Sequence, residues 1–289
     1  MKKEIIFFCP SIEEGGVEKN LYLLSNQLCK KFQTTLITAN KNKKKMFDKK
    51  IKFLSTTKLD INFAPRIVKS VFCLFLVLKN YYQRKNEYLI ISFESNIFAI
   101  IVAKILKVPV IIRSNASPTG YIKNESKKFI FSFLFKFADV ILVNSFEFKN
   151  KIDKILNIKS KVIYNSTIDK SIQRKLSRKK IPKIKISYKS YKIIIVGRLV
   201  DQKDHITTLK ALSLLRNKIN FFLLVVGKGE LENKLKIFCK KNKINNKVKF
   251  LGYKNNIYPY LKWCDALILS SKYEGSPNVL IEAISMNRT

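Results

Sequence analysis

Residues 191–203 of this chain read YKIIIVGRLVDQK, an apolar run that ends directly on Gly-Arg. A short run of this kind is typical of a buried parallel strand, and the glycine marks the loop that follows the strand. Similar runs recur at 221–226, 248–251 and 266–269, with helical stretches between them. This alternation predicts a doubly wound α/β domain over residues 191–289.

The residues before this stretch predict a first domain of the same class, over residues 1–168. Its predicted strands are Ile5–Phe8, Thr35–Thr38, Tyr88–Ser92, Val110–Arg113, Val140–Asn144 and Val162–Tyr164, and Gly16–Lys30 is a predicted helix. Residues 169–190 are basic and lack an apolar period, so they predict an interdomain linker with a hairpin or first turn of the next domain. The sequence stops at ISMNRT, just after a helix begins, so we expect the second domain to be incomplete and the chain to be truncated.

The composition limits the class of protein. Hydrophobic residues make up 47% of the 289, enough to bury a core in each domain, which excludes a disordered chain. No apolar run approaches the roughly 20 residues of a membrane span. The start, MKKEIIFFCP, has too short an apolar part for a signal peptide and predicts a first core strand. Five scattered cysteines without a CxxC motif fit free thiols, so we expect a cytoplasmic protein.

The chain is strongly basic, with 57 Lys and Arg against 20 Asp and Glu and a formal net charge of +37. Such an excess is typical of proteins that bind nucleic acid, which makes nucleic acid a candidate partner. Only eight of the basic residues are arginine, however, and neither clustered arginines nor interleaved aromatics are visible. We therefore expect a solvated lysine coat that favours anionic membranes or anionic substrates, and no nucleic-acid partner.

Glycines and charged residues gather where the second domain's strands are predicted to end. They are Gly197, Arg198 and Lys203 after the first strand, Gly227 and Gly229 after the second, Gly252 after the third, and Glu274 and Glu282 after the fourth. Ligands bind at this edge of an open α/β sheet, and two fixed cations beside a helix N-terminus suit a diphosphate. Taken singly, the glycines are also explained by tight turns, and the charged residues by an ordinary surface.

Several of these segments resemble one enzyme family. EGSPNVLIE (274–282) resembles the E-x7-E signature of retaining glycosyltransferases with the GT-B fold, specifically glycosyltransferase family 4. VGRLVDQKD, VVGKGELENKLK and VKFLGY resemble further segments of that family, and SIEEGGVEKNLYLLSNQL resembles its N-terminal Gly-Gly loop and helix. The resemblance implies two Rossmann-like domains facing a central cleft. It also implies transfer of a sugar from a nucleotide-sugar donor to a glycan or lipid-linked acceptor, in surface polysaccharide or lipopolysaccharide biosynthesis.

The resemblance also implies roles for individual residues. Arg198 and Lys203 would neutralise the diphosphate leaving group, and Glu274 would contact the transferred sugar, which makes these three the expected catalytic residues. The expected donor-binding residues are Gly15, Gly16, Gly197, Gly227, Gly229, Tyr253, Asn278, Val279, Leu280 and Glu282. Within that set, Glu282 would hold the ribose and Tyr253 would lie near the base.

This sequence departs from the family pattern in one stretch of the first domain, and it lacks the metal-binding motif of another class of glycosyltransferase. Many family members carry a first-domain histidine near the acceptor, and here the comparable stretch holds Arg113, Ser114 and Asn115. Arg113 and Asn115 are therefore expected on the acceptor or donor side, while His205, the sole histidine, is expected to begin a helix. There is no D-x-D motif of the kind that holds a metal in GT-A enzymes. We expect no metal and no cofactor, with a UDP- or GDP-linked sugar as substrate.

Two apolar stretches edged by basic residues leave open whether the protein attaches to a membrane. They are APRIVKSVFCLFLVLKNYYQRK (64–85) and KKFIFSFLFKF (127–137). One interpretation makes them core helices, and the other makes them sites of peripheral attachment to the inner face of the plasma membrane. Two functions remain as alternatives to glycosyl transfer: a truncated, non-catalytic remnant that keeps the sugar-nucleotide cleft, and a basic nucleic-acid-binding protein.

Overall fold

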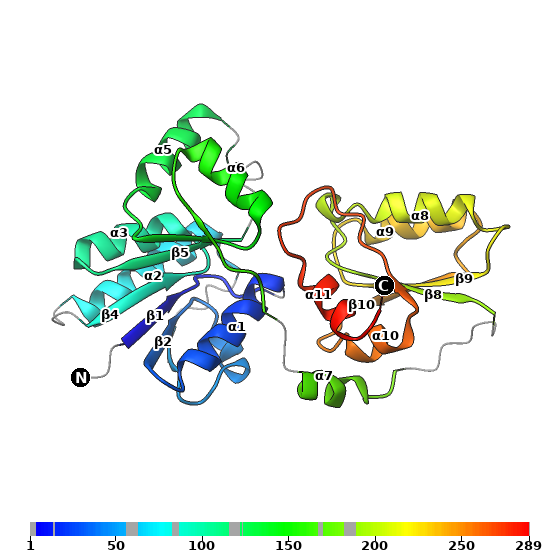
Figure 1. Ribbon diagram of the computed structural model, residues 1–289, viewed down its shortest axis with the longest axis horizontal. Helices are drawn as coiled ribbons and strands as arrows, with labels where there is room; N and C mark the ends of the chain where they lie inside the picture. The colour runs from blue at the N-terminus through cyan, green and yellow to red at the C-terminus, as the bar shows by residue number, and fades with distance from the viewer. Residues whose placement is uncertain are drawn as a thin grey trace. The chain divides into compact units, whose positions relative to one another are not determined.

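The computed structural model describes residues 4–13, 15–55, 63–82, 87–115, 122, 124–166, 170–181 and 189–288. The chain divides into two compact units, Met1–Ser166 and Thr167–Thr289 (Figure 1). Each unit is an α/β domain with a parallel sheet, as the sequence predicts. No helix in the described ranges is long and apolar enough to cross a bilayer.

Unit 1 is built on a seven-stranded parallel sheet. Its strands are β1 (Glu4–Phe8), β2 (Gln33–Ile37), β3 (Lys52–Leu54), β4 (Tyr88–Ser92), β5 (Val110–Ser114), β6 (Val140–Val143) and β7 (Lys161–Val162). They lie in the order β3-β2-β1-β4-β5-β6-β7. The chain runs outward from β1 in one direction and then from β4 in the other, so the strand order reverses between β1 and β4. Loops diverge at such a point and leave room for a ligand.

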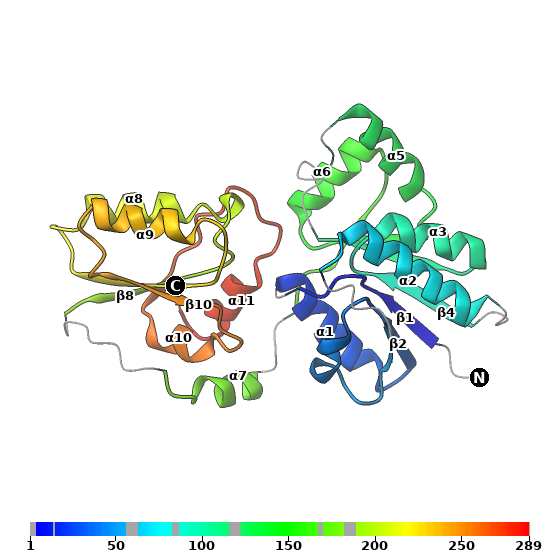
Figure 2. The ribbon, with the colours of Figure 1, turned by 180° about the vertical axis from the view of Figure 1, so that it is seen from behind.

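Helices cover both faces of this sheet. They are α1 (Gly16–Leu28), α2 (Arg66–Tyr81), α3 (Asn96–Leu106), α5 (Glu125–Phe135) and α6 (Phe146–Leu156), with a 3-10 helix η1 (Lys41–Met46). The alternation along β1 divides the core, because neighbouring side chains of a strand point to opposite faces. Ile6 and Phe8 pack with residues of α2, α3, α5 and α6, whereas Ile5 and Phe7 pack with those of α1. Figure 2 shows α2 and α3 side by side on one face.

Unit 2 has a four-stranded parallel sheet in the order β10-β9-β8-β11. The strands are β8 (Tyr191–Val196), β9 (Phe221–Val226), β10 (Val248–Gly252) and β11 (Ala266–Leu267). The helices are α7 (Lys170–Ser177), α8 (His205–Leu214), α9 (Glu232–Lys241), α10 (Tyr258–Trp263) and α11 (Asn278–Ser285), with a 3-10 helix η2 (Asp201–Lys203). Helices α8 and α9 cover one face, and α10 and α11 cover the other (Figure 1).

The structure differs from the sequence prediction in two segments. The edge strand β3 was not predicted, because its three residues form too short a run to stand out. The range 169–190, expected to be a linker, contains α7, which lies against α10. Leu176 and Ile181 pack into the apolar cluster under α10 and α11. This part of the range therefore belongs to the second unit, while residues 182–188 lie outside the described ranges.

Candidate functional site

The loops that end β8 and β9 of unit 2 pack backbone against backbone. Gly227 has a φ of +151°, and a Cβ there would lie 1.8 Å from the carbonyl oxygen of Gly197. A Cβ on Gly229 would lie 2.4 Å from the carbonyl oxygen of Leu199. Only glycine permits so close an approach. Gly227 and Gly229 are thus required by the packing of the two loops, which accounts for them without a ligand.

Backbone hydrogen bonds fix the same loops to one another. The N–H of Gly197 donates to the carbonyl of Val226 at 3.0 Å, and the N–H of Leu199 donates to that of Lys228 at 2.9 Å. The N–H of Gly227 in turn donates to the carbonyl of Gly252 at 3.0 Å. The ends of β8, β9 and β10 therefore form one connected platform, as expected for a preorganised site at the carboxyl edge of a sheet.

Lys203 and Glu274 form an ion pair on this platform. The Lys203 Nζ lies against the Glu274 Oε1, and both side chains are largely buried. Lys203 ends η2, and Glu274 lies in the loop between β11 and α11. The methylenes of Lys203 lie beside Gly197, where a Cβ would be 3.5 Å from the Lys203 Cδ. The structure thus brings together two of the three predicted catalytic residues, although 71 positions separate them in the sequence.

Further contacts hold the Glu274 loop to the η2 turn. The N–H of Lys272 donates to the carbonyl of Gln202 at 2.9 Å, and the Gln202 side-chain amide donates to the carbonyl of Tyr273 at 3.2 Å. The hydroxyl of Ser270 donates to the carbonyl of Asp204 at 2.8 Å. These bonds fix the position of the carboxylate relative to the ammonium, so the pair does not depend on its own attraction alone.

Arg198, the third predicted catalytic residue, is exposed and held through its backbone. Within the described ranges no carboxylate pairs with its guanidinium. Its carbonyl oxygen lies 3.1 Å from the Nε2 of His205, which is 3% exposed. A carbonyl only accepts, so the Nε2 carries the proton, and burial lowers the pKa of His205, which favours the neutral ring. His205 begins α8, as predicted, and it also holds the Arg198 peptide in place.

Glu282 lies inside α11 and is 3% exposed. The hydroxyl of Tyr258, at the start of α10, donates to the Glu282 Oε1 at 3.3 Å. Burial raises the pKa of Tyr258 to about 12, so this hydroxyl keeps its proton and remains a donor. Tyr258 was not predicted from the sequence, because no motif around it indicates that its hydroxyl donates to Glu282. Glu274 and Glu282 therefore have different surroundings, one beside a cation and one beside a phenol.

The remaining predicted donor residues of unit 2 lie at the same edge of the sheet. Tyr253 follows β10 and is partly exposed. Asn278, Val279 and Leu280 form the first turn of α11, after the N-cap Pro277. The side chain of Pro277 makes no capping hydrogen bond. The first backbone N–H groups of a helix point out of its N-terminus, as phosphate binding requires.

In unit 1, Gly15 and Gly16 are exposed at the start of α1. Gly15 is the N-cap and offers no side chain to cap the helix. Lys19, one turn into α1, was not predicted to matter. Burial lowers its pKa from 10.5 to about 8, so part of the population is uncharged near neutral pH.

Arg113 and Asn115, the residues predicted on the acceptor or donor side, are used inside unit 1. Arg113 is buried at the end of β5, and its guanidinium donates to the carbonyl of Ile163 at 3.1 Å and to the side chain of Asn165 at 2.8 Å. Its Nε donates to the Asn115 Oδ1 at 3.1 Å. The Asn115 amide donates to the carbonyl of Phe93 at 3.0 Å. The structure thus gives Arg113 a role in joining the end of β5 to the segment after β7.

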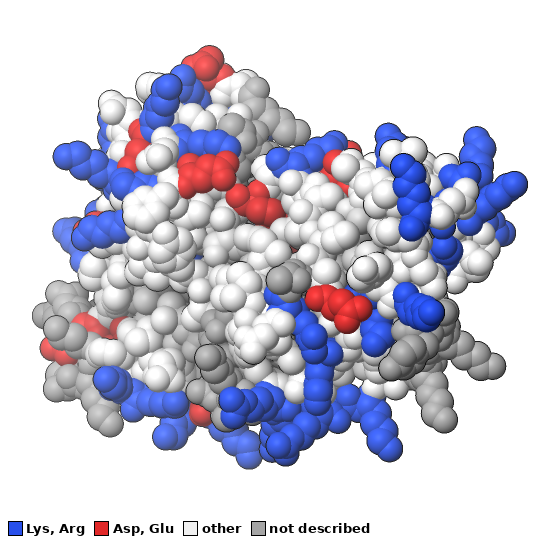
Figure 3. Space-filling view, turned by 45° about the vertical axis from the view of Figure 1, so that its right-hand side comes forward, with Lys and Arg blue, Asp and Glu red and all other residues white. Residues whose placement is uncertain are grey.

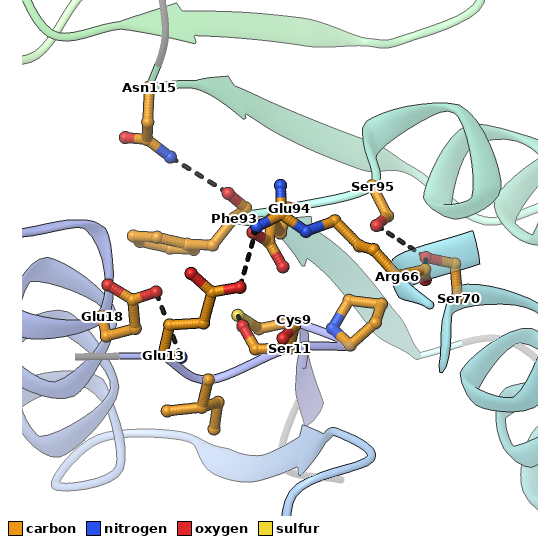
Figure 4. A network of polar contacts seen from close by, with 12 residues as sticks. Cys9, Ser11, Glu13, Glu18, Arg66, Ser70, Phe93, Glu94, Ser95 and Asn115 are labelled. Carbon is orange, nitrogen blue, oxygen red and sulfur yellow. Dashed lines mark hydrogen bonds and ion pairs between the residues drawn. The ribbon is translucent and has the colours of Figure 1, made fainter. Parts of the chain in front are cut away.

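A polar network that the sequence does not reveal lies at the reversal of strand order in unit 1 (Figure 4). Glu94 follows β4, and its Oε1 lies 3.3 Å from the Nη2 of Arg66 at the start of α2. The same Nη2 lies 3.0 Å from the Oε1 of Glu13, in the loop after β1. The second oxygen of Glu94 is buried and has no hydrogen-bond partner among the described residues. Burial raises the pKa of Glu94 from 4.5 to about 7, with Arg66 opposing that rise.

Within the described ranges, no group of three or more His, Cys, Asp or Glu side chains is placed to hold a metal ion. The five cysteines are free and buried. The prediction of a metal-independent reaction stays a prediction.

Comparison with known proteins identifies relatives of this chain. The family model for glycosyl transferases group 1 matches residues 177–287. An N-acetylgalactosamine-N,N'-diacetylbacillosaminyl-diphospho-undecaprenol 4-alpha-N-acetylgalactosaminyltransferase of Campylobacter jejuni is 29% identical over 96% of this chain and 77% of its own length. An uncharacterized glycosyltransferase of Methanocaldococcus jannaschii is 35% identical, over 54% of this chain and 40% of that protein. This chain therefore aligns with less than half of the archaeal relative.

Solved structures share the fold at low sequence identity. The Anabaena protein HepE in complex with UDP-glucose superposes with a TM-score of 0.75 at 17% identity, covering 99% of this chain and 79% of that one. The sucrose-phosphate synthase of Thermosynechococcus elongatus superposes with a TM-score of 0.76 at 14% identity, covering 99% and 80%. At these identities the likeness shows the fold alone, which is the GT-B fold predicted from the sequence.

Proposed function

The chain belongs to the glycosyl transferases group 1 and has the GT-B fold, and from this premise we propose that it transfers a sugar from a nucleotide-sugar donor to a lipid-linked glycan. The transfer retains the configuration at the anomeric carbon. The observation that carries the proposal is the interlocked edge of unit 2, where the Lys203–Glu274 pair and Arg198 lie on a platform of strand ends.

The charges at this edge suit the departure of a nucleoside diphosphate. As the bond between sugar and phosphate breaks, negative charge grows on the leaving phosphate and positive charge grows on the sugar. Arg198, without a carboxylate partner in the described ranges, offers its full charge to the diphosphate. Lys203 shares its ammonium between Glu274 and the incoming phosphate. The platform fixes the Lys203 side chain and the Arg198 peptide before the reaction, which reduces the reorganisation needed in the transition state.

The two carboxylates act on different parts of the donor. Glu274, beside the leaving-group cation, contacts the hydroxyls of the transferred sugar and stabilises the charge that develops there. Glu282 accepts hydrogen bonds from the ribose, since an ionised carboxylate is a pure acceptor. Tyr258 is a positioning residue, because its hydroxyl fixes the Glu282 carboxylate from α10. The Tyr258→Phe variant should raise the Michaelis constant for the donor with little change in kcat.

The names of the relatives narrow the substrates. The C. jejuni relative is named for transfer to an undecaprenol-linked diphosphate glycan, and an Escherichia coli relative, 32% identical over 33% of this chain, is named a UDP-Gal:alpha-D-GlcNAc-diphosphoundecaprenol alpha-1,3-galactosyltransferase. The second name favours a UDP-sugar as donor, and both names favour a polyprenyl-diphosphate glycan as acceptor. Both substrates are anionic, which agrees with the basic composition of the chain. The work would take place at the inner face of the plasma membrane, by peripheral association.

The test is a transfer assay with defined substrates. UDP-N-acetylgalactosamine, UDP-galactose, UDP-glucose and GDP-mannose are each offered with a short-chain polyprenyl-diphosphate glycan, and the product's anomeric configuration is read by NMR. We expect transfer from at least one UDP-sugar with retention. An inverted product would reject the retaining mechanism, and failure of every donor to react or bind would reject the function.

A further inference from the structure

Three neighbouring helices of unit 1 present apolar side chains to solvent. Helix α3 contacts both α2 and α5, and all three cover the same face of the seven-stranded sheet (Figure 2). Exposed apolar side chains on them include Ile67, Val71 and Phe75 on α2, Ile105 on α3, and Phe129 and Phe133 on α5. Phe75 is 62% exposed and Phe129 is 72% exposed. We name these six residues the α2–α3–α5 face.

The helical period separates this face from the core. Ile67, Val71 and Phe75 recur every four residues and form one stripe along α2, while Cys73, Val77 and Tyr81 of the same helix are buried. On α5 the pair Phe129 and Phe133 repeats this spacing, and Phe135 points into the core. The buried side chains bear out the interpretation as core helices for one side of α2 and α5, while the other side of the same helices lies in solvent. Scattered apolar residues on a surface need no explanation, but stripes on two helices that both contact α3 do.

The charged residues of the three helices are mostly basic. Helices α2 and α3 contain no acidic residue, and α5 contains only Glu125. Exposed Lys79, Lys104, Lys107 and Lys127 lie on or next to the three helices. An apolar surface edged by lysines is complementary to a bilayer with anionic headgroups, because the apolar side chains enter the acyl boundary while the ammonium groups meet the lipid phosphates.

From this complementarity we propose that the α2–α3–α5 face is the surface by which the chain lies on an anionic lipid bilayer. The proposal rests on the proposed function, since a lipid-linked acceptor is presented at a membrane surface. Arg66, the first residue of α2, is bound to Glu13 and Glu94 at the reversal of strand order, and Ile67 of the face follows it directly. The face therefore begins next to the edge of unit 1 at which a doubly wound domain takes a ligand. An acceptor whose lipid stays in the bilayer has a short path to that edge.

The experiment compares two matched pairs of substitutions by co-sedimentation with vesicles. Phe75→Asp with Phe133→Asp removes two side chains of the face. Ile237→Asp with Leu214→Asp removes two side chains of unit 2 with similar exposure, Ile237 being 62% exposed like Phe75. Vesicles are made of phosphatidylglycerol or of phosphatidylcholine, and thermal unfolding verifies that every variant is folded. We expect the unsubstituted chain to bind phosphatidylglycerol vesicles, and the face variant to bind about tenfold more weakly or less. The unit 2 variant should bind as the unsubstituted chain does.

Equal losses in both variants, or no loss in either, would overturn the proposal. Sedimentation velocity without lipid is run alongside, and a dimer that only the face variant abolishes would assign the face to a second copy of the chain and overturn it too. Transfer to a water-soluble acceptor separates the two proposals. The face variant should keep that activity, whereas absence of transfer in all forms of the protein would reject the proposed function and leave the vesicle result standing.

Discussion

The carboxyl edges of the two sheets differ in how their charges are held. In unit 2 the Lys203 ammonium and the Glu274 carboxylate lie together on loops that glycines let interlock. In unit 1 the Glu94 and Glu13 carboxylates share one guanidinium, that of Arg66, and one Glu94 oxygen is buried without a partner among the described residues. At the first edge the Lys203 charge is paired with that of Glu274, whereas the second edge holds a carboxyl group whose pKa is raised by burial to about 7. This difference favours binding of the leaving group at the edge of unit 2, and a charge that varies with pH at the edge of unit 1.

Glycine substitutions should have the largest effect, and it should differ between the two edges. Gly227→Ala would place a Cβ 1.8 Å from the carbonyl of Gly197, so we expect a loss of about 3–5 kcal/mol in the free energy of unfolding. Gly15→Ala in unit 1 meets only the flexible end of Glu18, at 2.8 Å, in an extended backbone, so its effect should stay within about 0.5 kcal/mol. Denaturant unfolding of both variants measures the contrast, and equal losses would show that the unit 2 loops can relax.

A pH series on Glu94→Gln tests the other edge. The pKa of Glu94 in the folded chain, about 7, lies above its ordinary value, so the folded chain keeps a proton that the unfolded chain releases above about pH 4.5. The free energy of unfolding should therefore fall as the pH rises from 4.5 to 7. Glu94→Gln removes this loss and should be more stable than the unsubstituted chain by up to about 3 kcal/mol at pH 8, and equally stable at pH 4. Glu125→Gln, at an exposed position, is the control. A stability difference that does not vary with pH would contradict the account of Glu94.

Most strands of both sheets could be predicted from the sequence, whereas one helix and several side-chain contacts could not, for physical reasons. Buried parallel strands are continuous apolar runs, so nearly all strands and the glycines that end them could be placed. Helix α7 was not, because a lysine-rich segment with few apolar positions carries no clear period. The Arg66–Glu94 ion pair joins the start of α2 to the loop after β4, which no motif connects, and Tyr258 contacts Glu282 between α10 and α11. Such contacts depend on tertiary structure and leave no local pattern.

The two glutamates of unit 2 should differ in their kinetic roles, although both lie at the same edge of the sheet. Glu274→Gln leaves Lys203 without its carboxylate and removes charge beside the reacting sugar, so we expect kcat to fall by about tenfold or more. Glu282→Gln removes an acceptor that serves bound donor and transition state alike, so the Michaelis constant for the donor should rise with a smaller change in kcat. Steady-state kinetics on both variants decide between these patterns. Unchanged kinetics in both would mean that neither carboxylate touches the donor.

The smallest effect is expected from removal of metal ions. Arg198 and Lys203 are proposed to neutralise the diphosphate, so EDTA should change the transfer rate by less than about twofold. The same assay with added Mg²⁺ or Mn²⁺ after EDTA is the control. If EDTA abolishes activity and either ion restores it, a metal ion contributes to neutralising the diphosphate, which would contradict the role proposed for the two side chains.

We propose that cations at the edge of unit 2 stabilise the departing diphosphate, and Arg198→Ala removes one of these cations. Arg198 is exposed and pairs with no carboxylate among the described residues, so its loss should leave stability unchanged. Lys210→Ala, at an exposed position on α8, removes one positive charge elsewhere on the unit. Measured as kcat/KM for the donor, Arg198→Ala should lose about 100-fold or more while Lys210→Ala loses less than about twofold. Near-equal kcat/KM values for Arg198→Ala and the unsubstituted chain would contradict the claim.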